Sequence, residues 1–209
     1  MVEAPDTVIV IDDDPDVREA LGRLLRSGGL GASAYGSVSE FLKAGRSEGP
    51  TCMVLDVRLP GKGGLEFQRD LASAGLHLPI IFITGHGDIP MSVEAIKGGA
   101  IEFLTKPFRD QDLLNAIHSG LERDRSQRAK DKALIELRER FNALTQRERE
   151  VMALVVTGRP NKVIAGEIHV SEITVKVHRG NVMRKMEAES LADLVLMSEK
   201  LRASSETPP

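Results

Sequence analysis

The sequence predicts an α/β domain with a doubly wound, five-stranded parallel sheet, followed by an all-α domain of four helices. The chain has 209 residues, which favours two domains because domains commonly span roughly 100–150 residues. In the first 122 residues, short apolar runs alternate with segments of helical periodicity, a pattern typical of parallel strands joined by helices. Beyond residue 140, only helical patterns recur.

Each strand of the predicted sheet is a short run, placed near residues 7–12, 31–35, 52–57, 79–84 and 101–105. The runs at 8–11 and 80–83 are apolar without alternation, as expected where helices cover both faces of a sheet. The first helix has clear end signals, because Asp14 can cap it, Pro15 suits its first position and Gly28 stops it. Further helices are predicted over about 38–45, 64–74, 89–98 and 110–122.

The domain boundaries follow from these patterns. We predict a first domain over residues 5–122, a helical linker over 123–140, a second domain over 141–202 and a disordered tail over 203–209. Residues 123–132 are mostly charged and have almost nothing to bury, so the linker is expected to be solvated. An apolar stripe follows, which is either a short coiled-coil seam or the anchor of the second domain: Leu134, Leu137, Phe141 and Leu144.

Capping signals divide the second domain into four helices. Thr145 and Glu148 have the spacing of a capping box, and the helix they begin ends near Pro160. A short helix is predicted over 161–168, a third from the cap Ser171 to residue 186, and a fourth after the cap Ser190.

Composition restricts the compartment and the partners. A single cysteine, Cys52, excludes an internal disulfide, and its place in an apolar run predicts a buried, inert thiol. No stretch approaches the roughly 18 apolar residues of a membrane span, so we expect a cytoplasmic protein without a membrane partner. The net charge of −3 is uneven, because residues 1–120 are acidic and the remainder is mildly basic.

Polar residues follow four of the predicted strands: Asp12 and Asp13, Asp56, Thr84, and Lys106. The carboxyl ends of parallel strands meet at one edge of the sheet, where ligands bind in such folds. Clustered carboxylates suit a divalent cation, an aspartate can attack phosphorus, and a hydroxyl and an ammonium can contact phosphoryl oxygens. Taken singly, each residue could equally cap a helix or face solvent. Agreement among four strand ends favours a shared site.

Four motifs resemble the receiver domain of bacterial two-component response regulators, a flavodoxin-like fold: IDDDP (11–15), LDVRLPG (55–61), ITGHG (83–87) and FLTKPF (103–108). The resemblance implies that Asp56 accepts a phosphoryl group from a sensor histidine kinase. It also implies an Mg²⁺ (or Mn²⁺) site formed by Asp12, Asp13, Asp56 and the backbone carbonyl of Arg58. Thr84 and Lys106 would contact the phosphoryl group, Thr84 and Phe103 would form the switch, and a cis Lys106-Pro107 peptide is expected.

The resemblance further implies that phosphorylation produces a homodimer through residues 89–122. Phosphorylation adds roughly −1.5 to −2 charges at neutral pH. Thr84 would move toward the new oxygens, and Phe103 would turn into the vacated space. Arg58 and His86 lie two residues after Asp56 and Thr84, and we predict that they set the lifetime of the phosphoryl group, which its rate of loss from variants would test.

The second domain carries a helix-turn-helix pattern around residues 169–171. Between Arg159 and Lys185 there are six basic and two acidic residues, which favours DNA, although a small protein-interaction domain has a similar pattern. The motifs LTQREREV (144–151), NKVIA (161–165), SEITVKVH (171–178) and NVMRKM (181–186) resemble the LuxR/NarL-type DNA-binding domain. With GHGDIPM (85–91), the whole chain is similar to the FixJ-like response regulators.

This resemblance predicts two sets of DNA contacts. Residues of the recognition helix are expected at the DNA, namely Thr174, Val175, Lys176, His178 and Arg179, and phosphate contacts are expected at Lys162 and Arg184. Gly180 lies inside the predicted recognition helix, where glycine destabilises the helix by about 1 kcal/mol relative to alanine. It could permit close approach either to DNA or to a neighbouring helix.

The leading functional hypothesis is a transcription factor that is activated by phosphorylation, binds promoter DNA as a dimer and acts on RNA polymerase, most simply as an activator. It is not expected to be an enzyme that turns over a metabolite. Two alternatives remain: an orphan DNA-binding regulator that ignores phosphorylation, and a phosphatase or phosphotransfer enzyme that uses Asp56 as its nucleophile. The first is disfavoured by the complete set of pocket residues, and the second by the absence of a further general acid or base in these motifs.

Overall fold

The computed structural model describes residues 5–45 and 48–206. The chain divides into two compact units, the first ending at Arg128 and the second beginning at Ala129.

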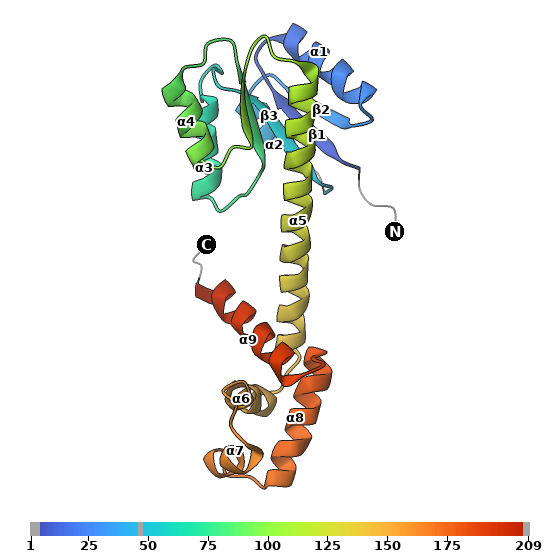
Figure 1. Cartoon of the computed structure of the whole chain (residues 1–209), viewed down its shortest axis with the longest axis vertical. Coiled ribbons are helices and arrows are strands. Elements are labelled where there is room, and N and C mark those ends of the chain that lie inside the picture. Colours follow the sequence, from blue (N-terminus) through green and yellow to red (C-terminus); the bar gives the residue numbers. More distant parts are fainter. Residues whose placement is uncertain (1–4, 46–47, 207–209) are drawn as a thin grey trace. The chain divides into compact units, whose positions relative to one another are not determined.

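The first unit is the predicted doubly wound parallel sheet, with helices on both of its faces (Figure 1). The strand order is β2-β1-β3-β4-β5, and all neighbouring strands are parallel. The strands are β1 (Thr7–Ile11), β2 (Gly31–Tyr35), β3 (Thr51–Asp56), β4 (Ile80–Thr84) and β5 (Glu102–Thr105). The helices are α1 (Pro15–Ser27), α2 (Val38–Ala44), α3 (Gly64–Ser73), α4 (Ile89–Lys97) and the first part of α5 (Asp110–Asn142).

Alternate residues of the central strands supply two separate cores. Ile9, Met53 and Phe82 belong to one buried cluster, which also contains residues of α2, α3 and α4. Val8, Cys52 and Ile81 belong to the other, with residues of α1 and α5. Both faces of the sheet are therefore apolar, which explains the unbroken apolar runs in the sequence. Cys52 is fully buried, and burial raises the pKa of its thiol to about 12, as expected of an inert cysteine.

The strand order reverses between β1 and β3, which are neighbours although β2 lies between them in the sequence. Ile11 pairs with Leu55, so the next residues, Asp12 and Asp56, lie side by side at the carboxyl edge. Ligands of open α/β sheets bind outside this reversal point.

Helix α5 continues for 33 residues through the predicted linker. The expectation that residues 123–132 are merely solvated is wrong for Asp124, which is only 2% exposed. Its carboxylate accepts hydrogen bonds from the backbone N–H of Thr51 (2.8 Å) and from Nε of Arg128 (2.7 Å). The backbone N–H of Thr51, the first residue of β3, needs a hydrogen-bond acceptor, and Asp124 of α5 provides it.

The second unit contains the four predicted helices α6 (Gln146–Val155), α7 (Asn161–Glu167), α8 (Glu172–Met186) and α9 (Leu191–Glu206), with the end of α5. Leu137 and Leu144 are buried in its core and Phe141 packs against them, so the apolar stripe anchors this unit. The predicted disordered tail is wrong for residues 203–206, which continue α9. Residues 207–209 lie outside the described residues.

The predicted capping box is present at the start of α6. Glu148 accepts a hydrogen bond from the backbone N–H of Thr145 (2.8 Å), and the hydroxyl of Thr145 accepts one from the N–H of Glu148 (3.3 Å). The ammonium of Lys185 on α8 donates to the same carboxylate at 2.6 Å. Glu148 is 3% exposed, and the hydrogen bond from Lys185 lowers its pKa to about 2.

Replacing Glu148 with Gln is expected to lower the free energy of unfolding of this unit by about 1.5–3 kcal/mol at pH 7, because Gln keeps the cap but loses the charge paired with Lys185. The pKa of Glu148 is lower in the folded protein than in the unfolded chain, where it is near 4.5. The charged carboxylate therefore stabilises the folded state at pH values above 4.5, and this stabilisation is lost as the pH falls through about 2. The difference from the unaltered protein should therefore shrink between pH 4.5 and 2, measured by urea unfolding with hydrogen exchange of the α6 amides.

The matched control is Glu150→Gln. Glu150 pairs with Arg147 at the surface of the same helix, and such pairs contribute less than about 1 kcal/mol. Equal effects of the two substitutions, or a Glu148→Gln effect independent of pH, would contradict the assignment.

Candidate functional site

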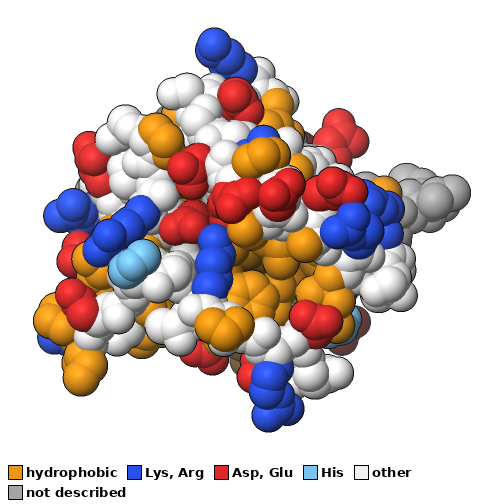
Figure 2. Space-filling view, turned by 90° about the horizontal axis from the view of Figure 1, so that it is seen from above, with side chains coloured by type: hydrophobic (Ala, Val, Ile, Leu, Met, Phe, Trp, Pro, Cys, Tyr) orange, Lys and Arg blue, Asp and Glu red, His pale blue; other side chains and the backbone are white. Residues whose placement is uncertain are grey.

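Three carboxylates meet at the carboxyl edge of the sheet. Asp12 follows β1 and is fully buried, Asp56 ends β3 and is 7% exposed, and Asp13 is exposed. Each offers an oxygen, and these atoms all lie within 4.8 Å of one another. In Figure 2, which looks onto this end of the first unit, acidic side chains gather around a basic one.

The ammonium of Lys106, which follows β5, lies between two of these carboxylates. Its Nζ donates to Oδ2 of Asp12 at 2.6 Å and to Oδ2 of Asp56 at 2.8 Å. Burial raises the pKa of Asp12, and the hydrogen bond from Lys106 offsets only part of this effect. Burial by itself lowers the pKa of Lys106, but the two carboxylates outweigh it and hold the pKa above its ordinary value. The Lys106-Pro107 peptide is cis, as expected.

Backbone amides orient the two buried carboxylates. The N–H of Asp14 donates to Oδ1 of Asp12 (2.9 Å), and the N–H of Arg58 donates to Oδ1 of Asp56 (2.8 Å). Each aspartate thus has one oxygen held by backbone and the other facing Lys106. Such a fixed, oxygen-rich cluster fits a hard divalent cation. The Arg58 carbonyl ligand stays a prediction.

Thr84 and Phe103 lie beside this cluster and close to each other. Thr84 ends β4, is 1% exposed, and its hydroxyl accepts a hydrogen bond from the N–H of His86 at 3.2 Å. Phe103 on β5 is half-buried, with its ring 6.4 Å from that of Phe82. A Cβ at Gly87 would lie 2.8 Å from Phe103 and 2.9 Å from Thr84, so Gly87 keeps the space between them clear.

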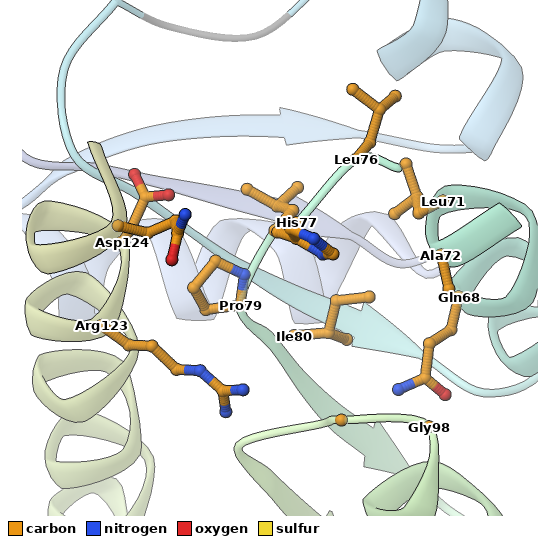
Figure 3. A pocket seen from close by; sticks show the side chains of 13 residues that line it. Gln68, Leu71, Ala72, Leu76, His77, Pro79, Ile80, Gly98, Arg123 and Asp124 are labelled. Atoms are coloured by element: carbon orange, nitrogen blue, oxygen red, sulfur yellow. The ribbon is translucent and has the colours of Figure 1, made fainter. Parts of the chain in front are cut away.

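Another cavity, of about 310 Å³, lies at the opposite end of the sheet (Figure 3). His77 and Pro79, just before β4, line it together with Arg123 of α5. None of the predicted metal, phosphoryl or switch residues borders it.

In the second unit, α7 and α8 are joined by the predicted turn, in which His169 has a positive φ of 55°. The side chain of Ser171 caps α8 by accepting a hydrogen bond from the N–H of Thr174 at 3.1 Å. This is a helix-turn-helix arrangement, in which the second helix is the one suited to a DNA groove.

The predicted DNA contacts fall into three groups by exposure. Lys162, Lys176 and Arg184 are exposed, whereas Thr174, His178 and Arg179 are half-buried. Val175 is fully buried in the core of the unit, so its assignment as a DNA contact is wrong. Its side chain packs inward because the residues that continue its face along the helix are also core residues, Val182 and Met186.

Two of the half-buried residues also have roles inside the unit. Arg179 donates to the side-chain oxygen of Asn161 at the start of α7 (3.2 Å). Nδ1 of His178 is enclosed and has no hydrogen-bond partner among the described residues. Ile173 and Val177, not predicted as contacts, are exposed instead. Once Val182 is known to be buried, helical spacing places both residues on the opposite side of α8.

Two family comparisons cover most of the chain. Residues 8–118 match the response regulator receiver domain, and residues 142–198 match the luxR family of bacterial regulatory proteins. The chain belongs to the response regulators. Its second domain is therefore a LuxR-type DNA-binding domain, and the regulator acts in transcription.

Relatives of this response regulator span nearly the whole chain. Nodulation protein W of Bradyrhizobium diazoefficiens is 52% identical over 95% of this chain and 87% of its own length. The transcriptional regulatory protein FixJ of Azorhizobium caulinodans is 46% identical over 91% of this chain and 90% of its own. The solved structure of response regulator StyR is 48% identical, covers 94% of this chain and 100% of its own, and has a TM-score of 0.84.

Proposed function

We propose that this response regulator is activated by phosphorylation of Asp56 by a sensor histidine kinase, and that the phosphorylated form dimerises and binds promoter DNA. The observation that carries the proposal is the ammonium of Lys106, 2.8 Å from Asp56 and 2.6 Å from Asp12. A cation held against a buried carboxylate is placed to meet the negative oxygens of an incoming phosphoryl group.

The transfer uses one oxygen of Asp56 as nucleophile. The bond between that oxygen and phosphorus forms as the bond from phosphorus to the kinase histidine breaks, and the imidazole leaves carrying a proton. The N–H of Arg58 holds the other oxygen of Asp56 and so orients the attack. Lys106 then pairs with a phosphoryl oxygen. Asp12, Asp13 and Asp56 would hold Mg²⁺ (or Mn²⁺), whose charge neutralises the transferred group.

The signal would leave the site through Thr84 and Phe103. The added charge attracts the hydroxyl of Thr84, and the ring of Phe103 turns into the vacated space, a population shift between two packings. Gly87 leaves room for both side chains. The surface beside them carries exposed apolar residues on α4 that a dimer would cover: Ile89, Val93 and Ile96.

In the second domain, α8 would enter the major groove, with Lys162 and Arg184 at phosphates and Lys176 at bases. Recruitment of RNA polymerase by the bound dimer would activate transcription.

Among residues 5–45 and 48–206, no helix combines the length and apolar character needed to cross a membrane. We place the regulator in the cytoplasm, where promoter DNA and kinase domains are accessible.

The test is footprinting of promoter DNA by the full chain with and without acetyl phosphate as phosphodonor. Phosphorylation is expected to lower the protein concentration needed for protection, because dimerisation joins two DNA-binding domains on one site. An equal footprint in both conditions, with Asp56 shown to be phosphorylated, would favour the orphan regulator instead.

A further inference from the structure

Helix α8 has a core-facing side and an opposite side that the rest of the unit leaves uncovered. Val175, Val182 and Met186 are buried. On the opposite side, at spacings of three and four residues, lies the outer face of α8, all of it exposed: Ile173, Lys176, Val177, Gly180 and Arg184. Nothing in the fold of the described second unit accounts for the composition of this face.

Two members of the outer face are large and apolar. Ile173 is 77% exposed and Val177 is 58% exposed. They are neighbours one turn apart, in the first half of the helix. Because neither contributes to the core cluster of this unit, their side chains are available to a partner.

Gly180 lies on the same face, in the interior of the helix. A Cβ added there would meet no atom within 4 Å among the described residues, and its φ is not in the left-handed region. Glycine is unfavourable inside a helix, and neither backbone conformation nor a neighbouring helix requires it here. Of the two explanations that the sequence leaves open, only close approach to an external partner remains.

The charges around this face indicate the chemistry of that partner. Lys176 and Arg184 lie on the face, and Lys162 is exposed on α7. A narrow helical face with cations and a bare backbone fits the major groove of a polyanionic duplex. Within that groove, the apolar group that aliphatic side chains can contact is the C5-methyl group of thymine.

We propose that Ile173 reads the methyl group of a thymine in the half-site, and that Gly180 allows the backbone of α8 to approach the DNA closely. The inference rests on the proposed DNA-binding function and adds a base preference to it. Lys176 and Arg184 position the helix on the duplex, while Ile173 sets the preference for thymine at one position.

The experiment measures the affinity of the phosphorylated full chain for a footprinted duplex in which each thymine in turn is replaced by uracil. Uracil pairs like thymine but lacks the methyl group. One replacement is expected to weaken binding about fourfold, the value of one buried methylene-sized group. Ile173→Ala should weaken binding to the thymine duplex by a similar factor and remove the difference between thymine and uracil.

Two further variants serve as a control for Ile173→Ala and as a test of the role of Gly180. Leu196→Ala removes a comparably exposed side chain (57%) from α9 and should leave both the affinity and the preference for thymine unchanged. Gly180→Ala should raise the urea midpoint of the second unit yet weaken DNA binding, a combination that a purely structural glycine would not give.

Three outcomes overturn the inference. If the protein binds equally well to every duplex in which one thymine is replaced by uracil, Ile173 reads no methyl group, although the proposed function stands. If Ile173→Ala alters self-association of the free protein and leaves DNA affinity intact, the outer face contacts another copy of the chain. Absence of DNA binding by the phosphorylated protein would overturn both the inference and the proposed function.

Discussion

Asp56→Asn is expected to abolish phosphorylation of this response regulator by acetyl phosphate, with no phosphoprotein detectable by intact-mass spectrometry. The amide is not a nucleophile toward phosphorus and carries no charge to pair with Lys106. Like Asp12, Asp56 has one carboxylate oxygen held by a backbone N–H, that of Arg58, and the other by Nζ of Lys106. Neutralising it leaves Asp12 as the partner of the ammonium.

The control is Asp110→Asn, which changes an exposed carboxylate at the start of α5 and should leave phosphorylation unchanged. Phosphate incorporated into the Asp56→Asn protein at an unreduced rate would show that another carboxylate accepts the group. Folding of the variant is checked by its urea midpoint.

The second large effect is expected for Gly64→Ala, at the beginning of α3. A Cβ there would lie 2.4 Å from the carbonyl oxygen of Asp56 and 3.1 Å from the ring of Phe82. The N–H of Gly64 donates to the carbonyl of Val57 at 3.0 Å, which holds the helix start against the end of β3. The added methyl group must separate the two segments, at a cost of about 3 kcal/mol.

The urea midpoint of Gly64→Ala should be lower than that of the unaltered protein. Its rate of phosphorylation should also change, because the segment that carries Asp56 is displaced. Gly36→Ala is the matched control, since the nearest atoms to its Cβ would be ordinary contacts at 3.5 Å. Unchanged stability in Gly64→Ala would mean that α3 can move without disturbing β3.

The close approach of Gly64 to Asp56 and Phe82 is a contact that local sequence patterns do not predict. The sequence predicts a helix near residue 64 and a phosphoacceptor at Asp56, yet the contact between them depends on how α3 packs. Asp124 is a similar case. Its neighbours in the sequence are charged and solvated, and its burial follows from the hydrogen bond that its carboxylate accepts from the N–H of Thr51 at the start of β3. Helix α9 continues past the predicted end at residue 202, because element ends are weakly signalled in sequence.

The DNA-binding domain shows the same division. The caps Thr145 and Ser171 predict where its helices begin, since a side chain that caps the helix acts on the nearest backbone amides. The sequence also gives α8 its basic residues. It does not decide which side of α8 faces the core, so it predicts Val175 at the DNA although this residue is buried.

The sequence by itself determined the parallel sheet and the meeting of Asp12, Asp56, Thr84 and Lys106, because parallel strands bring their carboxyl ends to one edge whatever their detailed packing. Only the tertiary structure decided that Lys106 contacts both aspartates, that Asp124 is buried and that Ile173 and Gly180 face outward. These features depend on distances between segments far apart in the chain and on the rotation of each helix about its axis. Periodicity limits that rotation, and packing against the core sets it.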